Sequence, residues 1–570
     1  MTNGEVATIF LRLADYLEIA GENPFKTRAY RNAAQTLQSM TVPIADVAAA
    51  GGLGEIPGFG PAIIGKTKDI LATGTTKVYA QMQAQIPEGV LEFLKLPGIG
   101  VKTVNQLWDG LQVCDLDELE LAAKGGRVRT LKGMSEKTEV KILDAIARYR
   151  KYSKEWLLDA ADDMADALVA ALNQLPGVTH ASIAGDLRRR TETVGDIVLV
   201  VASDDPAATV AAFTALPQIR DVVDSSTGGA RVILSNAMPC ELLAVAPGAF
   251  AAALAVRTGS TGHVDGLISL ASEKGFALSG DGLFRDGERI STGNEDALYG
   301  AVGLSPIPPT MREDTGEIVL ALSGALPRVV QLSDIRGNLH QHTTASDGHN
   351  TIEEMAAAGV ALGYEYMAIT DHSKALAMTN GLTVERLRDQ IKAVREAEQT
   401  AGIRLFAGSE VDILADGTMD FPDDVLAELD IVVASVHSRF SMERDEMTAR
   451  VLKAVSNPHV DILAHPTGRL LTAREPYDID IAAVIEAAAE SHTALEINAF
   501  PDRLDLNETY AKAASAAAVP IVINTDAHKT WHLGFMKYGV AIAQRAWLTK
   551  EAVLNTRSLA ALEAWIRERG

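Results

Sequence analysis

The part of the chain from Asp334 onward alternates between two kinds of segment, and this alternation constrains the fold more than any other feature. Short runs rich in branched side chains, such as YMAIT and IVVAS, are separated by longer Ala- and Glu-rich stretches. A regular exchange of strand and helix is the pattern of a parallel sheet whose crossovers are helices. We therefore expect a parallel α/β domain or barrel in this region.

Potential metal ligands stand where the predicted strands of this region end. Strand ends of a barrel converge on one rim, and side chains at i and i+2 of a strand share a face. Imidazole and carboxylate together suit Zn, Mn or Fe, and clustered ions of this kind hydrolyse phosphoesters. The predicted metal ligands are His340, His342, Asp347, His372, Glu410, His437, His465, Asp526 and His528.

Two segments near the N-terminus share a glycine turn that leads into an amphipathic helix. IPGFGPAIIGKTKDIL (56–71) and LPGIGVKTVNQLWDGL (96–111) have the same pattern, and a looser copy begins at Leu131. Such turns also serve as plain helix connectors. In a repeated form they favour DNA binding, because glycine lets the backbone approach a phosphate and the following helix N-terminus points N–H groups at it. The predicted DNA-binding residues are Gly58, Gly60, Gly98, Gly100 and Lys102.

Length and charge limit the classes of protein that this chain can belong to. At 570 residues it is too long for one core, so two or more domains are expected. The net charge of −23 excludes broad coating of nucleic acid, so any DNA contact should be local and directed at the backbone, as near Lys124 and Lys132. Two cysteines, and no apolar run long enough for a membrane span, fit a cytoplasmic protein.

The order of these parts resembles bacterial family X DNA polymerases that carry a C-terminal PHP (polymerase and histidinol phosphatase) domain. The resemblance rests on NPFKTRAYRNAA, GDLRRRTETVGDIVLVV, RTGSTGH, IPPTMREDTGE, the helix-hairpin-helix turns and the nine filled ligand positions. It implies a distorted (β/α)7 barrel that binds up to three divalent ions. The implied division is an 8-kDa-like helical domain (1–85), a fingers-like helical domain (86–155), a nucleotidyltransferase-like palm (156–245), a small α/β thumb (246–318), a linker (319–335) and the PHP domain (336–570). Composition alone also favours a connector at 305–317, where prolines and charges gather.

The palm departs from the family at its metal site. The family's Asp-x-Asp pair reads Asp196-Ile197-Val198 here, and Glu241 stands at the position of the third carboxylate. Valine cannot ligate a metal, and the loss of one ligand should cost several kcal/mol of transition-state stabilisation. Further departures around the nucleotide are Asp186, Arg257, Val264 and Ile268. Efficient templated synthesis is therefore not expected, although Mg or Mn would serve the palm if it were active.

Other residues match the family. Arg189 and Gly195 match its triphosphate-binding positions, and Lys66 matches its Schiff-base lysine for abasic sites. A lysine beside such a turn also serves as a plain phosphate partner. Arg469, in HPTGR, is a candidate phosphate contact, with a surface salt bridge as the alternative.

The resemblance and the residues together predict a monomeric DNA-repair protein. It would hold gapped, nicked or abasic DNA and trim 3′ ends by metal-dependent hydrolysis, as a 3′-5′ exonuclease. Three alternatives stay open: a gap-filling polymerase that uses deoxynucleoside triphosphates, with Asp186 as a substitute carboxylate; a DNA-binding scaffold that delivers the nuclease; and a small-molecule phosphatase.

Overall fold

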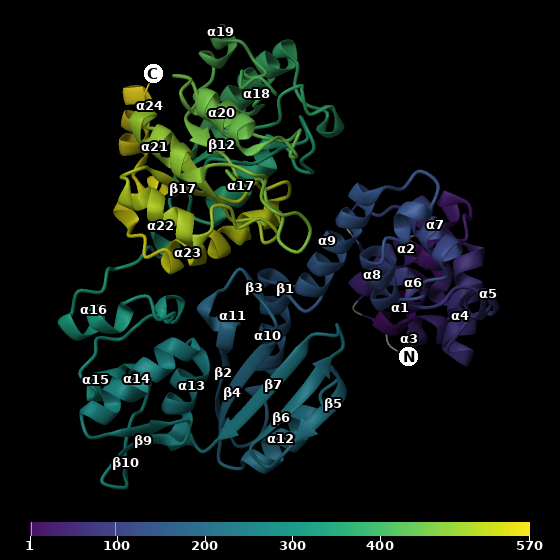
Figure 1. The fold of residues 1–570 in the computed structure, drawn as a ribbon. Coiled ribbons are helices and arrows are strands. Elements are labelled where there is room, and N and C mark those ends of the chain that lie inside the picture. Colours follow the sequence, from purple (N-terminus) through teal and green to yellow (C-terminus); the bar gives the residue numbers. More distant parts are fainter. Residues whose placement is uncertain (2, 41, 57, 97, 570) are drawn as a thin grey trace. The chain divides into compact units, whose positions relative to one another are not determined.

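The chain folds as two units, which are each described by themselves (Figure 1). The computed structural model describes residues 1, 3–40, 42–56, 58–96 and 98–569. The first unit comprises Met1–Lys154 with Ser235–Ala237, and the second comprises Glu155–Leu234 with Met238–Gly570. Among the described helices, none is both long and apolar enough to cross a bilayer.

The first unit is helical. Its first helix, α1, has Phe10, Leu13 and Leu17 on one buried face that packs mainly against α2, as the helical spacing of these residues requires. Asn23 and Thr76 cap α2 and α5 through their side chains. The helices are α1 (Asn3–Ile19), α2 (Pro24–Ser39), α3 (Ile44–Ala49), α4 (Pro61–Thr73), α5 (Lys77–Gln85), α6 (Val90–Phe93), α7 (Val101–Leu111), α8 (Leu116–Lys124) and α9 (Glu136–Tyr152), with short 3₁₀ turns η1 (Gly52–Glu55) and η2 (Val128–Thr130).

The glycine turns fold alike. Gly58 and Gly98 have φ angles of 82° and 76°, a conformation that favours glycine, and both residues are exposed. Helices α4 and α7 begin directly after Gly60 and Gly100. The looser third copy has the same geometry, with Gly133 at a φ of 81° shortly before α9. The prolines of the two clear copies, Pro57 and Pro97, lie outside the described residues.

The second unit begins with a five-stranded sheet. Strand β4 lies between β2, to which it is antiparallel, and β7, to which it is parallel. All seven of its residues are buried. Val198 of β4 is in register with Glu241 of β7. The strands run in the order β2 (Val178–Ala184), β4 (Ile197–Ser203), β7 (Pro239–Val245), β6 (Gly229–Leu234) and β5 (Ile219–Ser225), accompanied by the pair β1 (Trp156–Leu157) and β3 (Thr193–Val194) and by α10 (Leu158–Leu172), α11 (Gly185–Arg189) and α12 (Pro206–Thr214).

A smaller α/β layer follows the sheet and has a core of its own. Leu267, Leu298 and Tyr299 are fully buried in this core. Its elements are η3 (Pro247–Ala249), α13 (Phe250–Thr258), α14 (Thr261–Glu273), β8 (Ala277–Ser279), β9 (Gly282–Arg285), β10 (Glu288–Ile290), α15 (Glu295–Ala301), η4 (Pro309–Met311) and α16 (Glu317–Ser323).

The interval 305–317 is part of this folded layer and is not an extended connector. Met311 is fully buried, and Arg312 pairs with Glu295 at 2.5 Å. Glu317 is also fully buried, 2.6 Å from His263 Nδ1. The connector expectation for 305–317 is therefore wrong, because its charged residues are satisfied inside the fold. The interval 319–335 carries most of α16 and the fully buried Val330, which belongs to the core of the second unit.

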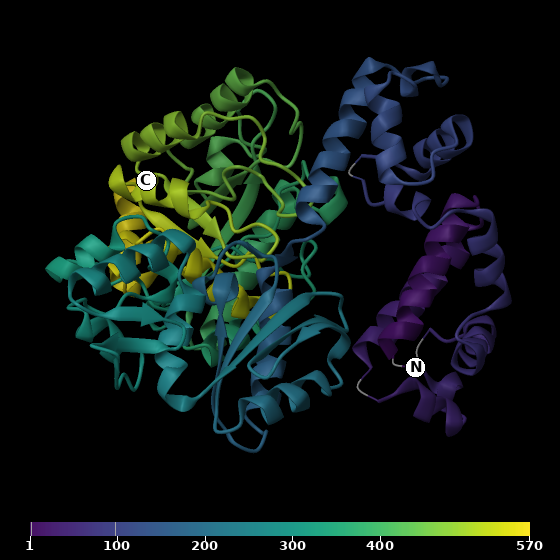
Figure 2. The same ribbon diagram turned by 60° about the horizontal axis from the view of Figure 1, so that its bottom comes forward.

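The C-terminal region is a seven-stranded parallel barrel, as predicted (Figures 1 and 2). A bridge between Gln341 and Ala527 connects its first and last strand ends. Leu562 and Trp565 of the last helix pack with the inward residues of the strands. The strands are β11 (Gly337–Asn338), β12 (Tyr366–Ile369), β13 (Arg404–Asp412), β14 (Ile431–Ser435), β15 (Ile462–Leu463), β16 (Ala494–Asn498) and β17 (Ile521–Asn524).

The crossovers of the barrel are helices, which bury the outward residues of the strands. This is the arrangement that the alternating sequence pattern predicts. The helices are α17 (Ile352–Ala361), α18 (Val384–Ala401), α19 (Asp423–Leu426), α20 (Arg444–Val455), α21 (Ile481–Ser491), α22 (Glu508–Ala516), α23 (Met536–Arg545) and α24 (Leu559–Arg569), with 3₁₀ turns η5 (Leu332–Asp334), η6 (Ala377–Thr379), η7 (Thr530–Phe535), η8 (Lys550–Ala552) and η9 (Leu554–Thr556).

Candidate metal centre

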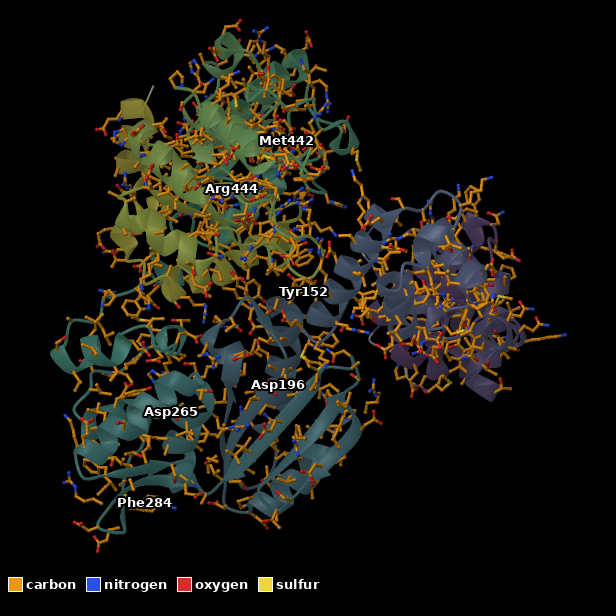
Figure 3. The ribbon with its side chains drawn as sticks, viewed as in Figure 1. Tyr152, Asp196, Asp265, Phe284, Met442 and Arg444 are labelled. Atoms are coloured by element: carbon orange, nitrogen blue, oxygen red, sulfur yellow. The ribbon has the colours of Figure 1, made fainter. Side chains whose placement is uncertain are left out.

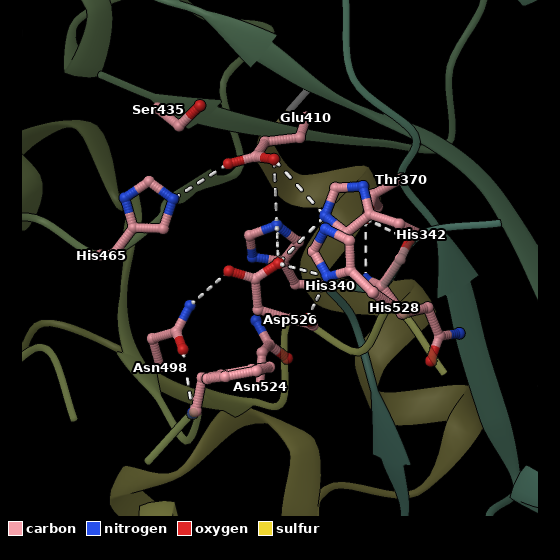
Figure 4. Close-up of polar contacts among 12 residues, drawn as sticks. His340, His342, Thr370, Glu410, Ser435, His465, Asn498, Asn524, Asp526 and His528 are labelled. Atoms are coloured by element: carbon pink, nitrogen blue, oxygen red, sulfur yellow. Dashed lines mark hydrogen bonds and ion pairs between the residues drawn. The ribbon is translucent and has the colours of Figure 1, made fainter. Parts of the chain in front are cut away.

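The nine predicted ligands converge at one end of the barrel. Each lies at or just beyond the carboxyl end of a strand, so parallel strands bring ligands that are far apart in sequence to one rim. In the close-up view, the side chains of His340, His342, Glu410 and Asp526 point toward one another (Figure 4). Strand β11 precedes three of them, β17 precedes two, and β12, β13, β14 and β15 provide one each.

Within this rim the ligand atoms form three overlapping groups. In each group, one atom from every residue lies within 4.8 Å of the others. The groups overlap at His342 and His372, so the ion positions that they predict would lie next to one another. The groups are His342, Asp347, His372 and His528; His340, His342 and Asp526; and His372, Glu410 and His437. His465, the ninth residue, joins them through Glu410, with 3.0 Å between its Nε2 and Glu410 Oε1.

The electrostatics of the cluster fit a site for cations. Burial alone would raise the pKa values of the Glu410 and Asp526 carboxyls, but the surrounding imidazoles hold both pKa values well below the usual range. Burial and the neighbouring His528 and His372 lower the pKa of His342 to about 4, which keeps this imidazole neutral and able to ligate. Against the effect of burial, the neighbouring carboxylates raise the pKa values of His340, His372 and His528, so the binding of ions would release the protons of these imidazoles.

Several buried ligand atoms lack a hydrogen-bond partner among the described residues. A buried polar atom without a partner costs free energy, so such atoms in one cluster point to an ion that satisfies them. The mixed donor set of nitrogen and oxygen suits Zn, Mn or Fe. The atoms are His340 Nε2, His342 Nδ1, His372 Nδ1, Glu410 Oε2 and His465 Nδ1, of which His372 Nδ1 and Glu410 Oε2 lie 2.8 Å apart as an ion pair. The residues present therefore fit divalent metal ions.

A buried glutamate orients two of the predicted ligands, and the sequence analysis did not identify it. Glu496 of β16 is fully buried, with its Oε1 2.8 Å from His340 Nδ1. Its other oxygen accepts the backbone N–H of His465 at 2.8 Å. The signal that could have found it is an acid inside the apolar strand ALEIN, since a carboxylate is not buried without charged or polar partners.

We expect Glu496→Gln to weaken metal binding by roughly 10- to 100-fold, as removal of a carboxylate behind a metal-bound histidine does. The amide keeps the size of the side chain but loses the charge that fixes the tautomer of His340. Titration of the chelated protein with Mn²⁺, followed by calorimetry, measures the change. Glu486→Gln on α21 serves as the matched control. Equal affinities in wild type and Glu496→Gln would contradict this role.

Asp371 holds the loop that carries Asp347. This aspartate is fully buried directly after β12, and its carboxylate accepts from the backbone N–H of Thr343 at 2.8 Å and from its hydroxyl at 2.7 Å. Ser346 donates to the same carboxylate. The contacts fold the segment after β11 back toward the cluster, which explains how a ligand outside a strand reaches it.

Arg469 does not face the metal ligands. Its guanidinium donates to both oxygens of Glu192, at 2.6 and 2.9 Å, and to the backbone carbonyl of Arg503 at 2.9 Å. Glu192 lies just before β3, so this ion pair joins the barrel to the preceding layer of the same unit. The guanidinium is occupied by these partners, which favours the salt bridge over the phosphate contact, although the pair is buried and not at the surface.

The palm carboxylates do not form a metal group. All three groups found among the described residues lie in the barrel. Asp196 is half-buried before β4 (Figure 3), and burial, followed by the charges of Asp186 and Glu241, raises its pKa. Val198 packs with apolar neighbours instead of extending a second carboxylate. Arg257 forms an ion pair with Glu241, so the site already contains a positive charge of its own.

The remaining predicted residues lie as follows. Arg189 is bound by Asp186, by Glu313 at 2.9 Å and by the carbonyl of Thr258 at 2.8 Å. Gly195 is exposed in the turn before β4. Lys66 of α4 lies 5.5 Å from the centre of the Tyr30 ring.

Lys102, the remaining residue that the sequence predicts to bind DNA, stands beside the second glycine turn. It lines a groove of about 770 Å³ together with Leu131 and Lys132, which belong to the third turn. The second and third turns therefore face one common surface.

Comparisons with known proteins agree with this architecture. Family models match a helix-hairpin-helix domain at residues 1–76, a SAM-like helix-hairpin-helix tandem at 90–148, a DNA polymerase beta thumb at 253–313 and a PHP domain at 338–500. The DNA polymerase/3′-5′ exonuclease PolX of Bacillus subtilis is 37% identical over 576 residues, covering 100% of both chains. A probable phosphatase of Thermoanaerobacter sp. is 31% identical over 38% of this chain and 89% of its own length, and one of Shewanella sediminis is 31% identical over 40% and 93%. Full-length identity at this level, with each part in the same order, shows that the chain belongs to the bacterial family X DNA polymerases that carry a C-terminal PHP domain.

Proposed function

We propose that this chain trims the 3′ ends of DNA by metal-dependent phosphodiester hydrolysis. The observation that supports this most is the assembly of eight predicted ligands into three overlapping, largely buried groups, which the ninth, His465, joins through Glu410. The relative from Bacillus subtilis is named as a 3′-5′ exonuclease, which agrees with such a site. Up to three ions, of Mn, Zn or Fe, would be held by these ligands.

Different residues of the cluster would hold different ions. His340 and Asp526 would hold one ion and Asp347 with His528 a neighbouring ion, and His342 lies within reach of both groups. Bound divalent ions supply Lewis-acid chemistry, which acidifies water and neutralises the charge that develops on phosphoryl oxygens. The protein fixes the ligand geometry through Glu496 and Asp371, so little reorganisation is needed when the phosphodiester binds.

We further propose that the helical unit and the palm hold the DNA while the barrel cuts it. The turns at Gly58 and Gly98 would contact the backbone of gapped, nicked or abasic DNA. In the palm, the Arg257–Glu241 pair and the apolar Val198 leave Asp196 without the partner carboxylate that two-metal nucleotidyl transfer uses. Lyase chemistry at Lys66 would be an additional activity on abasic sites.

A gap-filling polymerase is the second candidate function. Asp186 and Glu241 both act on the pKa of Asp196, so three carboxylates lie within electrostatic reach of one another. Such a cluster could take up Mg or Mn once a nucleoside triphosphate has displaced Arg257 from Glu241. Asp186 would then replace the carboxylate that Val198 lacks.

A 5′-labelled primer in a short gap, incubated with Mn²⁺ with and without deoxynucleoside triphosphates, separates these functions. We expect the primer to shorten alike under both conditions. Lengthening that depends on nucleotides and is lost in Asp196→Ala would instead establish the polymerase. Turnover of small phosphate monoesters far above turnover of DNA would favour a phosphatase, the activity named for the relatives that match only the barrel.

A further inference from the structure

Three side chains beside the metal cluster are not among its predicted ligands. Trp531 and Lys529 follow the ligand His528 in the loop after β17, and Arg503 lies in the loop after β16. Both loops extend from strand ends on the ligand side of the barrel. An exposed aromatic ring and two cations at the rim of a phosphodiesterase site suggest contacts to the substrate.

Trp531 is exposed but fixed in place. Its side chain is 62% exposed, although tryptophan is highly buried on average. The indole packs edge-on against His532, with 4.2 Å between ring centres, and against Phe535 at 5.3 Å. The backbone N–H of the ligand His528 donates to His532 Nδ1 at 3.3 Å. His532, on which the indole packs, is therefore hydrogen-bonded to a residue of the metal cluster.

The segment that carries Trp531 also contacts the loop that carries the ligand Asp347. The backbone N–H of Thr530 donates to the Asn350 side chain at 3.1 Å, and the backbone N–H of His349 donates to the carbonyl of His528 at 2.8 Å. Trp531 therefore stands on the rim, where two ligand-bearing loops meet.

Arg503 lies against the cluster from a third loop. Its Nε is 3.4 Å from Asp526 Oδ2, and its charge, after burial, helps to lower the pKa of His465. Phe500 of the same loop packs on His532 and on Phe535, with 5.1 Å between ring centres in both cases. The aromatic cluster of Phe500, His532 and Phe535 therefore supports both Arg503 and Trp531.

We propose that Trp531, Lys529 and Arg503 form a subsite for the 3′-terminal nucleotide of single-stranded DNA. The indole stacks on the terminal base, Lys529 neutralises a backbone phosphate, and Arg503 donates to a non-bridging oxygen of the scissile phosphodiester. Stacking on an aromatic ring accepts every base, and the planar guanidinium suits phosphate. The subsite deepens the proposed 3′-end hydrolysis and rests on it. It requires an unstacked terminal base, so frayed and single-stranded ends are the preferred substrates.

Hydrolysis kinetics of the full-length protein with Mn²⁺ test the subsite. We expect Trp531→Ala to raise KM for a single-stranded oligonucleotide about tenfold, with kcat nearly unchanged. Hydrolysis of bis(4-nitrophenyl) phosphate, which has no base to stack, should stay at the wild-type rate. Trp531→Phe should recover most of the loss. Leu362→Ala is the control, since Leu362 is 51% exposed on the barrel but lies directly after α17, before the next strand begins.

A second measurement does not depend on hydrolysis. The chelated protein is mixed with an oligonucleotide carrying 2-aminopurine either at the 3′ terminus or several nucleotides inside. We expect stacking to quench the terminal probe more than the internal one, and Trp531→Ala to remove this difference. Equal quenching in wild type and Trp531→Ala, or an unchanged KM, would overturn the subsite. A wild-type protein that hydrolyses neither substrate would overturn the proposed function, while the fluorescence difference would still decide on the subsite.

Discussion

Replacing His342 by alanine is expected to abolish phosphodiester hydrolysis and to leave DNA affinity unchanged. His342 belongs to two of the three ligand groups, and its ring centre lies 4.3 Å from those of both His372 and His528. Its loss removes an imidazole from the place where two groups overlap, so the rate should fall by at least ~10³-fold, which corresponds to about 4 kcal/mol. Release of the 3′-terminal nucleotide measures the rate, and fluorescence anisotropy of a labelled gapped duplex measures the affinity.

His459→Ala is the matched control for this change. His459 lies before β15 and belongs to none of the three ligand groups found among the described residues. Its replacement should leave the rate of hydrolysis within about twofold of wild type, because substitutions away from the core and from functional sites usually have small effects. Nuclease activity that survives in highly purified His342→Ala protein would refute the assignment of hydrolysis to the barrel.

Arg469→Met should lower the free energy of unfolding of the second unit by about 3–5 kcal/mol, the cost of leaving one partner of a buried ion pair alone. Glu192 would lose both hydrogen bonds to the guanidinium, while burial already raises its pKa. Two backbone carbonyls, of Arg503 and Leu504, would also lose a donor. Urea denaturation at neutral pH, followed by the fluorescence of the tryptophans, measures the shift of the midpoint.

The double variant Arg469→Met with Glu192→Gln serves as the control. Because it removes the unpaired charge as well, it should be more stable than Arg469→Met alone. An Arg469→Met protein with wild-type stability but a raised KM for DNA would restore the phosphate-contact interpretation of Arg469.

The sequence was informative where one strand end supplies one ligand. In the barrel, the parallel order of the strands places residues that follow the strand ends, such as His437 and Asp526, at the same rim. The position of these ligands could therefore be predicted from the strand pattern. The glycine turns were predictable for a similar reason, since Gly58 and Gly98 adopt a backbone conformation that other residues resist.

Pairing between distant charges was not predictable from the sequence. Glu192 and Arg469 meet through tertiary packing, and so do Glu241 and Arg257 in the palm. The sequence shows that Val198 and Arg257 depart from the family, but not that the arginine pairs with the remaining carboxylate. The prediction of a connector at 305–317 was wrong because it rested on the polar composition of this segment. Polar residues such as Glu317 can be buried when they find hydrogen-bond partners inside the fold.

The spread of the ligands along the barrel has a consequence for the newly made chain. The first predicted ligands follow β11, but Asp526 and His528 are added only after β17, the last of the seven strands. A nascent or truncated chain therefore lacks two ligands and the bridge between Gln341 and Ala527. A chain that stops before this strand is therefore expected to have an incomplete ligand cluster and no phosphodiester hydrolysis.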